Sequence, residues 1–488
     1  MESFRPVDAH DAELLTQVHP ADWKNPTPAP RYNLVVIGAG PAGLVAAAGA
    51  AGLGAKVALI ERHLMGGDCL NVGCVPSKTL LRCARAAAEA RAATRFGVRA
   101  TDVQVEFPVV MQHVRSLRAK LSHHDSAQRF TSLGVDVFLG EGRFAGSDTV
   151  SVGKDTLRFK KALIATGARA IILPIPGLRE TGCLTNETVF QLTEMPKRLG
   201  IIGAGPIGCE MAQAFARLGA KVYIFEAEAR ILPREDAEAA ALLHSTLERD
   251  GVTIRCSAAI QSIAKTSGEK QIVAAQGNTA VDEILLGVGR APNIESLNLE
   301  SADVAYTKTG VTTNEYLQTT NRHVYAAGDV CLPQKFTHSA DAAARIVLQN
   351  ALFAGRKKIS TAVIPWCTYT DPEIAHVGVY ESERTFTQNF GQVDRAVIEG
   401  QEGFVKVHTS KSSDRILGAT IAGPHAGEII SMISLAMRNE LGLRAFSDAL
   451  FPYPTLSEIM KKAADAHSRT RLTPGVKRLF EWWLRRTR

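Results

Sequence analysis

Two cysteines are the residues of this sequence best suited to carry out chemistry. Cys69 and Cys74 stand five positions apart in residues 66–78, which read GGDCLNVGCVPSK. Two such thiols can cycle between dithiol and disulfide, and the surrounding glycines keep the backbone thin where a flat ring would lie against the sulfurs. A closed zinc site is disfavoured because no second Cys or His pair has ligand spacing. We therefore predict catalytic redox use of this pair and no resident metal.

Two copies of one glycine-rich pattern indicate two dinucleotide sites. A short apolar strand leads into GAGPAG at 38–43, and the strand after the next helix ends in Glu61. The same order returns with GAGPIG at 203–208 and Glu226, so each acid stands 23 positions after the first glycine (61 − 38 and 226 − 203). The glycines permit a tight turn, close approach of a pyrophosphate and close packing of helix on strand, and the acid binds a ribose. The six fingerprint glycines are Gly38, Gly40, Gly43, Gly203, Gly205 and Gly208.

Two dinucleotides beside a dithiol favour a flavin that relays electrons between a nicotinamide and the cysteines. The helices and strands that position these groups must form large hydrophobic cores. The 488 residues are 45% hydrophobic and 22% charged, which fits about three globular domains. A net charge of +7 is too mild and dispersed to favour nucleic acid.

Cysteine usage and the first residues favour a cytoplasmic, reducing compartment. Eight cysteines in so long a chain do not form a disulfide scaffold, and residues 1–14 lack the apolar core of a signal peptide. Residues 34–55 carry no charge and are long enough to suggest a membrane span. Their Gly and Ala content fits a buried strand that feeds a helix better.

Several separated motifs resemble those of the pyridine nucleotide-disulfide oxidoreductases, which include dihydrolipoamide dehydrogenase, glutathione reductase and mercuric reductase. Besides the dithiol segment they are ATGA at 165–168, GVGRAPN at 287–293, YAAGD at 325–329, TDPEIA at 370–375 and GPHA at 423–426. The resemblance implies an α/β fold with two Rossmann-like domains, for FAD and NAD(P), and a C-terminal α+β dimerisation domain.

The same resemblance implies a domain order. We expect an N-terminal extension over 1–30, a FAD-binding domain in two parts over 31–177 and 290–360, an inserted NAD(P)-binding domain over 178–289, a dimerisation domain over 361–473 and a basic amphipathic helix over 474–488. Residues 1–30 are rich in Pro, Asp and His, so we expect an irregular arm that lies on the surface or on the partner subunit. Trp23 is its candidate anchor.

The resemblance also implies roles for the residues around the dithiol. Cys69 would attack the substrate, whereas Cys74 would face the flavin as a thiolate. Lys78 would lie beside the flavin and pair with Glu210. Lys78 stands one helical turn after Cys74 if a helix begins near Val75, and a nearby cation and a helix N-terminus both lower the pKa of a thiol.

The cofactors would be held by acids and glycines. Glu61 would bind the FAD ribose, Asp329 would lie near the ribityl and pyrophosphate, and Glu226 would bind the adenosine ribose of the nicotinamide cofactor. Glu226 would repel a 2′-phosphate, so NADH is preferred and NADPH is the alternative. Arg230 and Arg234 either soften that preference or are ordinary loop residues. Further implied cofactor contacts are Gly67, Thr166, Gly167, Gly328, Gly289 and Arg290.

One position departs from the family's disulfide enzymes. They have a His before Pro-Thr with a Glu five positions later, whereas here the positions hold Tyr453 and Glu458. An imidazole titrates near ~6.5 and a phenol near ~10, so Tyr453 is a poor general base. Phe-Pro-Tyr resembles mercuric reductase, although the C-terminal Cys pair and the N-terminal Cys-x-x-Cys domain of that enzyme are missing. His425, in a dimer-domain turn, and His467, at a solvated helix end, are weaker candidates for the base.

The last segment carries an apolar stripe. Val476, Leu479, Phe480, Trp483 and Leu484 recur at i, i+3, i+4, i+7 and i+8, with basic residues around them. Such a helix either packs on its own dimer or lies at a membrane interface.

These observations predict a homodimeric flavoprotein. NADH would reduce FAD, and the Cys69–Cys74 disulfide would take the electrons from the flavin. The acceptor would be a disulfide, a soft metal ion as in mercuric reductase, or a quinone-like molecule. One alternative is dihydrolipoamide dehydrogenase. The alternative of another class is a flavin-bearing redox sensor or membrane-associated interaction protein.

Overall fold

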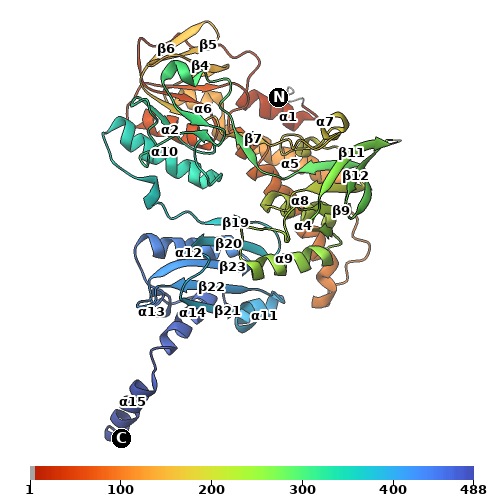
Figure 1. Ribbon diagram of the computed structural model, residues 1–488, viewed down its shortest axis with the longest axis vertical. Helices are drawn as coiled ribbons and strands as arrows, with labels where there is room; N and C mark the ends of the chain where they lie inside the picture. Colours follow the sequence, from red (N-terminus) through yellow and green to blue (C-terminus); the bar gives the residue numbers. More distant parts are fainter. Residues whose placement is uncertain (1–5, 267) are drawn as a thin grey trace. The chain divides into compact units, whose positions relative to one another are not determined.

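The computed structural model describes residues 6–266 and 268–488. The chain divides into two compact units (Figure 1): the first comprises Met1–Ala227 and Ser257–Ala362, and the second comprises Glu228–Cys256 and Val363–Arg488. The first unit contains both glycine fingerprints and the dithiol. This division keeps both predicted nucleotide-binding domains in one unit, so the boundaries predicted between them remain predictions.

A seven-stranded sheet carries the first fingerprint. Its path is β3-β2-β1-β6-β5-β4, with β18 paired to β6. The strands are β1 (Tyr32–Ile37), β2 (Val57–Glu61), β3 (Val135–Leu139), β4 (Gly142–Gly146), β5 (Thr149–Val152), β6 (Asp155–Ile164) and β18 (Val324–Ala326). β1 pairs in parallel with both β2 and β6. The chain from β1 through α2 (Pro41–Gly52) to β2 is therefore a βαβ unit.

The central strand β1 is buried on both faces, as its apolar run predicts. Leu34 and Val36 belong to one buried cluster, and Val35 and Ile37 belong to another. Two helices, α2 and α10 (Thr337–Leu352), pack against each other and contribute to the first cluster. The uncharged segment 34–55 is thus a buried strand and a helix, as expected. Among the described residues no helix has the length and apolar character needed to cross a bilayer.

A second parallel sheet repeats the arrangement. β8 (Arg198–Ile202) lies between β9 (Lys221–Phe225) and β14 (Glu283–Leu286), and α8 (Pro206–Leu218) connects β8 to β9. An antiparallel sheet joins β11 (Ile260–Thr266), β12 (Glu269–Ala274) and β13 (Gly277–Val281). Smaller elements of this unit are α6 (Ala127–Ser132), β7 (Ala168–Ala170), α7 (Leu178–Thr181), β15 (Arg290–Pro292), β16 (Tyr306–Thr307) and β17 (Gly310–Val311).

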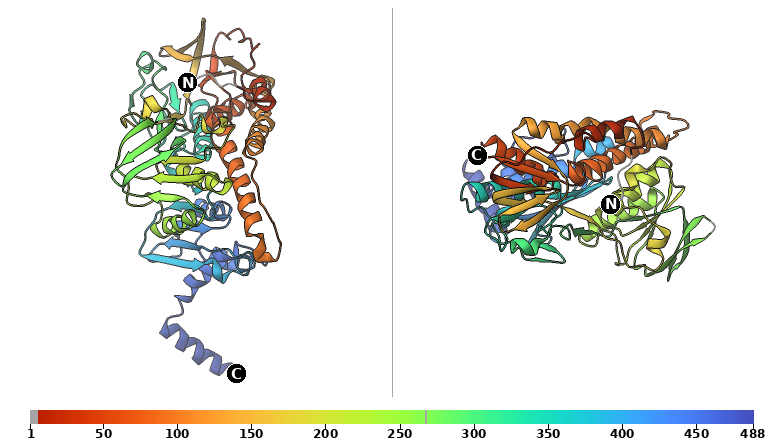
Figure 2. Two further views of the ribbon diagram at one scale, coloured as in Figure 1. Left: turned by 90° about the vertical axis from the view of Figure 1, so that its right-hand side faces the viewer. Right: turned by 90° about the horizontal axis from the view of Figure 1, so that it is seen from above.

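Three helices surround the dithiol. α3 (Gly67–Asn71) holds the first cysteine, α4 (Cys74–Ala92) begins at the second, and α5 (Phe107–Ser122) packs against α4. The expected helix start near Val75 is confirmed. Figure 2 shows these helices in two further views.

The expectation of an irregular N-terminal arm is wrong over part of its length. Residues Ala9–Val18 form a ten-residue helix, α1, which packs against α5 of its own subunit. Asp8 caps it by accepting from the backbone amides of His10 and Asp11, and Leu14 and Val18 are fully buried. Residues 20–30 contain no helix or strand. Trp23 does act as an anchor, because its indole donates to the Val137 carbonyl at 3.3 Å.

The second unit is built on a five-stranded antiparallel sheet of order β19-β20-β23-β22-β21. The strands are β19 (Trp366–Thr368), β20 (Glu373–Gly378), β21 (Arg384–Asn389), β22 (Phe404–Thr409) and β23 (Ile416–Gly423). Helices α9 (Ala237–Arg249), α12 (Ala426–Arg438) and α14 (Glu458–Arg469) pack on this sheet. The other elements are β10 (Thr253–Arg255), α11 (Asp394–Glu399), α13 (Ala445–Asp448) and α15 (Pro474–Arg486). The mixed parallel and antiparallel architecture confirms the predicted fold class.

Candidate active site

The dithiol segment is pressed against the first glycine turn. Gly66 and Gly67 have φ values of +88° and +55°, which L side chains rarely adopt. A Cβ on Gly67 would lie 2.7 Å from the Cα of Gly40. The two glycines therefore allow α3, the helix that holds Cys69, to begin directly beside the fingerprint at 38–43.

The two thiols differ in acidity. The Cys69 thiol donates a hydrogen bond to Cys74, which lowers the pKa of Cys74 to about 6 and raises that of Cys69. The hydroxyl of Thr337, at the start of α10, lies 3.3 Å from the Cys74 sulfur and lowers the same pKa. The pair, which carries no disulfide here, therefore holds one thiolate near neutral pH, at Cys74.

The predicted partner of Lys78 is present. The Lys78 ammonium donates to a Glu210 carboxylate oxygen at 2.9 Å, and the Glu210 side chain is only 5% exposed. Glu210 lies on α8, which packs against α4. The positive charge of Lys78 also contributes to lowering the pKa of Cys74. The helix that follows the second fingerprint thus fixes a cation near the dithiol.

The first glycine turn has the shape of a dinucleotide cradle. A Cβ on Gly43 would lie 1.8 Å from the Gly38 carbonyl oxygen, so helix and turn meet closely. The N-cap of α2 is Gly40, which offers no side chain to the first amides of the helix. Those amides remain available to a phosphate. The Glu61 carboxylate accepts a hydrogen bond from the Ala39 amide at 2.7 Å, so this side chain reaches the same turn. Burial raises the pKa of Glu61. These residues fit the FAD dinucleotide.

The second turn reproduces this geometry. A Cβ on Gly208 would lie 2.0 Å from the Gly203 carbonyl oxygen, and α8 also has an N-cap glycine, Gly205. Glu226 accepts from the Ala204 amide at 2.6 Å. Both copies therefore share the hydrogen bond from the turn amide to the acid at the strand end, and this turn fits a second dinucleotide.

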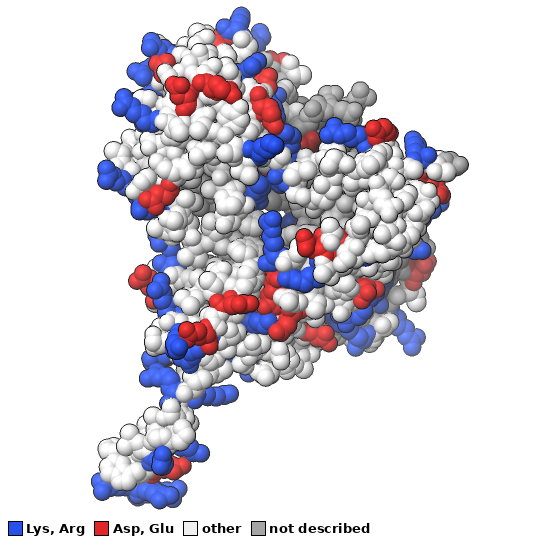
Figure 3. All heavy atoms as spheres, in the orientation of Figure 1, with Lys and Arg blue, Asp and Glu red and all other residues white. Residues whose placement is uncertain are grey.

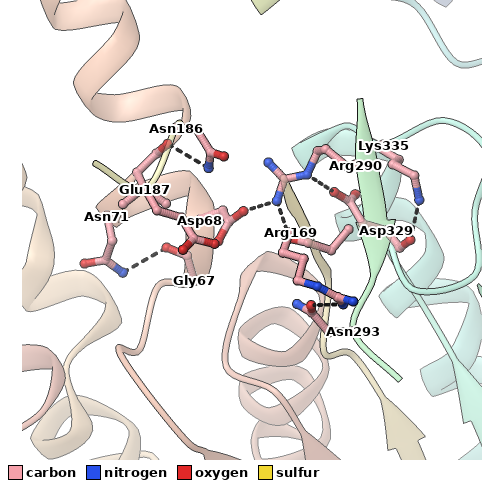
Figure 4. A network of polar contacts seen from close by, with 12 residues as sticks. Gly67, Asp68, Asn71, Arg169, Asn186, Glu187, Arg290, Asn293, Asp329 and Lys335 are labelled. Atoms are coloured by element: carbon pink, nitrogen blue, oxygen red, sulfur yellow. Dashed lines mark hydrogen bonds and ion pairs between the residues drawn. The ribbon is translucent and has the colours of Figure 1, made fainter. Parts of the chain in front are cut away.

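An ionic network connects the other implied cofactor residues (Figure 4). The Arg290 guanidinium donates to a carboxylate oxygen of Asp68 and to the carbonyl of Ala168, and its Nε lies 3.6 Å from Asp329. Burial raises the pKa of Asp329, and the Arg290 charge opposes that rise. Lys335 donates to the Asp329 carbonyl at 2.6 Å. Arg290 therefore offsets two acids at the edge of the first cradle.

Thr166 and Gly167 lie in the segment that meets this network. The Thr166 hydroxyl donates to the Asn293 carbonyl at 2.7 Å, and the Asn293 side chain donates back to the Thr166 carbonyl at 3.0 Å. β7 pairs antiparallel with β15, which joins this segment to the strand that begins at Arg290. Gly328, at φ +81°, precedes Asp329, and Gly289, at φ +110°, precedes Arg290.

Tyr453 and Glu458 lie in the second unit. The Tyr453 side chain is exposed, and its hydroxyl donates to Asp394 at 2.6 Å, which raises the pKa of the phenol. Glu458 accepts from the Thr455 amide at 3.3 Å. Their approach to the dithiol of a partner subunit remains a prediction. His467 is not at a solvated helix end: it is buried, and its ring contacts the edge of Phe386.

Several residues at the site were not singled out from the sequence. Thr337 carried only the weak signal of a hydroxyl at a helix start. Asp68 is an acid inside the dithiol motif, but no sequence pattern predicts its ion pair with Arg290. Arg118 is fully buried and donates to the Asn71 carbonyl, between the two cysteines, at 2.8 Å. Contacts of this kind depend on packing between distant segments.

The fold and the site define a class of enzyme: a dithiol oxidoreductase with two dinucleotide cradles. Residues 32–347 match the family model described as pyridine nucleotide-disulphide oxidoreductase, and residues 364–464 match the dimerisation domain of the same family. The chain therefore belongs to the pyridine nucleotide-disulphide oxidoreductases. It is an FAD-dependent enzyme that takes electrons from NAD(P)H, and its dimerisation domain supports a homodimer.

Curated relatives come from two branches of the family. A mercuric reductase of Staphylococcus aureus is 33% identical over 453 residues, which cover 89% of this chain and 82% of that protein. A dihydrolipoyl dehydrogenase of Bacillus subtilis is also 33% identical, over 467 residues that cover 89% of this chain and 98% of that protein.

Solved structures agree on the fold. The HOCl-induced flavoprotein disulfide reductase RclA of Escherichia coli, solved as a Cu(II) complex, has a TM-score of 0.80 at 28% identity and covers 88% of this chain and 98% of its own. LpdA of Mycobacterium tuberculosis has a TM-score of 0.82 at 26% identity and covers 90% and 99%.

Proposed function

We propose that this enzyme uses NADH and the Cys69–Cys74 pair to reduce a soft metal ion, with a small disulfide as the second substrate class. The observation that carries the proposal is the tyrosine at position 453. Its phenol is bound to Asp394 and has a raised pKa, so it does not accept a proton near neutral pH. An acceptor that needs no proton shuttle suits such a site.

The dithiol itself is suited to a soft cation. The Cys74 thiolate is available above pH about 6, and a metal ion can displace the proton of the less acidic Cys69 thiol. FAD, when bound in the first cradle, supplies a two-electron relay between the nicotinamide and the sulfurs. The overall reaction would be NADH + M²⁺ → NAD⁺ + H⁺ + M⁰ for a two-electron acceptor such as Hg(II), and NADH + 2 Cu²⁺ → NAD⁺ + H⁺ + 2 Cu⁺ for Cu(II).

The same residues would act on a disulfide by exchange. Cys69 attacks one substrate sulfur while its proton passes to the departing sulfur, so a mixed disulfide forms and the first thiol is released. Cys74 then attacks the Cys69 sulfur, releases the second thiol and leaves a Cys69–Cys74 disulfide. Overall, NADH + H⁺ + RSSR → NAD⁺ + 2 RSH. Lys78, held by Glu210, would keep Cys74 ionised for the second attack.

Charge supports NADH over NADPH. Glu226 is buried at the end of β9, where a 2′-phosphate would meet its carboxylate. Arg230 donates to four backbone carbonyls of its own loop, those of Ile231, Leu232, Pro233 and Glu235. Its guanidinium is therefore already engaged. The comparison of kcat/KM for the two nicotinamides tests this preference.

The relatives support both candidate activities. A mercuric reductase relative and a structural neighbour solved with Cu(II) favour the metal ion, and the dihydrolipoyl dehydrogenase relative keeps lipoamide as the runner-up. Dihydrolipoamide oxidation needs a base near the interchange thiol, which Tyr453 does not provide.

An acceptor screen tests the proposal. Holoenzyme with NADH would be offered Hg(II), Cu(II), lipoamide, glutathione disulfide and a quinone, alongside Cys69→Ser and Cys74→Ser. We expect metal-dependent NADH oxidation that both substitutions abolish. Activity that survives both substitutions would mean that electrons leave without the dithiol, as they would to a quinone-like acceptor.

Turnover also separates an enzyme from a redox sensor. A sensor would oxidise NADH only once per flavin, whereas the combination of Cys69, Cys74, Lys78 and Glu210 is suited to repeated cycles. We place this enzyme in the cytoplasm, where thiols stay reduced.

A further inference from the structure

The C-terminal helix α15 presents an apolar face that no described part of the chain covers. Leu479, Phe480, Trp483 and Leu484 are 58%, 53%, 59% and 62% exposed, and none of the helix is buried. Together with Val476 they recur every three or four residues, so they share one face. In Figure 1 and in the left view of Figure 2, α15 extends away from the sheet of its own unit. A face this apolar is costly to leave in water.

Basic side chains surround the apolar face. They are Lys477, Arg478, Arg485, Arg486 and Arg488. Glu481 is the single acid, so residues 474–488 carry a charge of +4 (5 − 1). Figure 3 shows Lys and Arg atoms gathered around the white atoms of this terminal helix.

We propose that α15 lies in the headgroup region of a membrane that contains anionic lipids. Its apolar face would enter the boundary between headgroups and acyl chains, and its cations would meet lipid phosphates. Tryptophan is favoured at this depth. The 13 residues of α15 span about 20 Å, less than the ~30 Å hydrocarbon core, so the helix lies in the membrane plane.

Electrostatic repulsion disfavours a second copy of the chain as the partner of this apolar face. Packing α15 against the α15 of another subunit would bring two segments of charge +4 together. The match to the dimerisation domain ends at residue 464, before α15 begins. α15 therefore lies outside the segment that matches the dimerisation domain.

The helix contains a matched control. Trp482 lies on the polar side, where the Arg486 guanidinium stacks over its ring at 4.2 Å from the centroid. Trp483, the next residue, lies on the apolar face. Substituting either one removes the same chemical group, but only Trp483 would enter the acyl boundary.

Vesicle co-sedimentation of the full-length holoenzyme tests the proposal. The vesicles would contain 7:3 phosphatidylcholine and phosphatidylglycerol, with pure phosphatidylcholine as the neutral arm. We expect sedimentation with the anionic vesicles that salt weakens. Trp483→Ser should lower the partition coefficient on the order of 10-fold and Trp482→Ser only slightly, because binding scales with buried apolar area. Arg485→Gln with Arg486→Gln should lower it about 25-fold.

Two results would overturn the proposal. One is sedimentation that does not depend on residues 474–488 or on anionic lipid. The other is a change in oligomeric mass on Trp483→Ser, which would show that a second copy covers the face. Because partitioning is measured without an electron acceptor, its outcome does not depend on the proposed activity.

Discussion

Arg118 joins the N-terminal helix to the dithiol segment through a buried ion pair with Asp11. The guanidinium donates to Asp11 at 2.5 Å, and the two side chains are 0% and 1% exposed. The same guanidinium donates to the Asn71 carbonyl, between the two cysteines. The segment that precedes the family match thus supports the loop that positions the dithiol.

Asp11→Asn would leave the Arg118 charge uncompensated in the core. We expect a loss of about 3–5 kcal/mol in the free energy of unfolding, measured by urea denaturation. Asp8→Asn is the matched control. Asp8 pairs with Arg115 at 2.6 Å but is 22% exposed, so its loss should cost less. Equal effects of the two substitutions would contradict this account of Arg118.

Titration of the dithiol tests the assignment of the thiolate. In the reduced protein, ultraviolet thiolate absorbance should rise with a midpoint near pH 6, and Cys74→Ser should remove it. Cys69→Ala removes the hydrogen bond to Cys74, and Lys78→Met removes the cation. Each should raise that midpoint by about one unit.

The shift also predicts how stability depends on pH. An unfolded thiol titrates near ~8.5, above the pKa of about 6 for folded Cys74. The thiolate therefore stabilises the fold fully above pH ~8.5, and this contribution is lost as the pH falls through about 6. Cys74→Ser should flatten the dependence in this window. An unchanged midpoint in Cys69→Ala would contradict the proposed hydrogen bond.

Two glycine substitutions separate the two cradles. Gly43→Ala places a methyl group 1.8 Å from a backbone oxygen in the first turn, so FAD content should fall severely. Gly208→Ala makes the corresponding clash at 2.0 Å in the second turn. It should leave flavin bound but raise the KM for NADH by about 10-fold or more.

Gly52→Ala is the control for these variants, because nothing lies within 4 Å of its added Cβ. Flavin content is measured by absorbance, and KM by steady-state kinetics. Loss of flavin from Gly208→Ala with retention in Gly43→Ala would reverse the assignment of the two sites.

Tyr453→His tests the choice of acceptor. An imidazole beside Glu458 would titrate near neutral pH and could exchange a proton with the partner's interchange thiol. We expect dihydrolipoamide oxidation to rise about 10-fold or more, since general bases contribute at least ~10² when well placed. Lipoamide turnover in the wild type that equals its best metal or disulfide activity would show that Tyr453 does not limit the reaction.

The sequence predicts the local parts of this site well. The glycine fingerprints, their terminal acids and the helix that begins at the second cysteine depend on neighbouring residues, and the structure confirms those elements. The Thr337–Cys74 contact and the Asp68–Arg290 pair join segments more than 200 positions apart, 337 − 74 and 290 − 68. No local pattern encodes them.

The N-terminal segment shows why composition can mislead. Its Pro and Asp content indicated an irregular arm, but Asp8 is a helix cap and Leu14 is a core residue. The helix gains its stability from burial against α5, which composition does not report.

The most direct test of the central claim is the visible spectrum of the holoenzyme reduced by one equivalent of NADH. If the Cys74 thiolate lies against the flavin, a long-wavelength charge-transfer band should appear in the wild type on this reduction, be present in Cys69→Ser before any reductant is added, and be absent from Cys74→Ser. A band that survives Cys74→Ser, or a purified protein that is colourless and cannot take up FAD, would contradict the account.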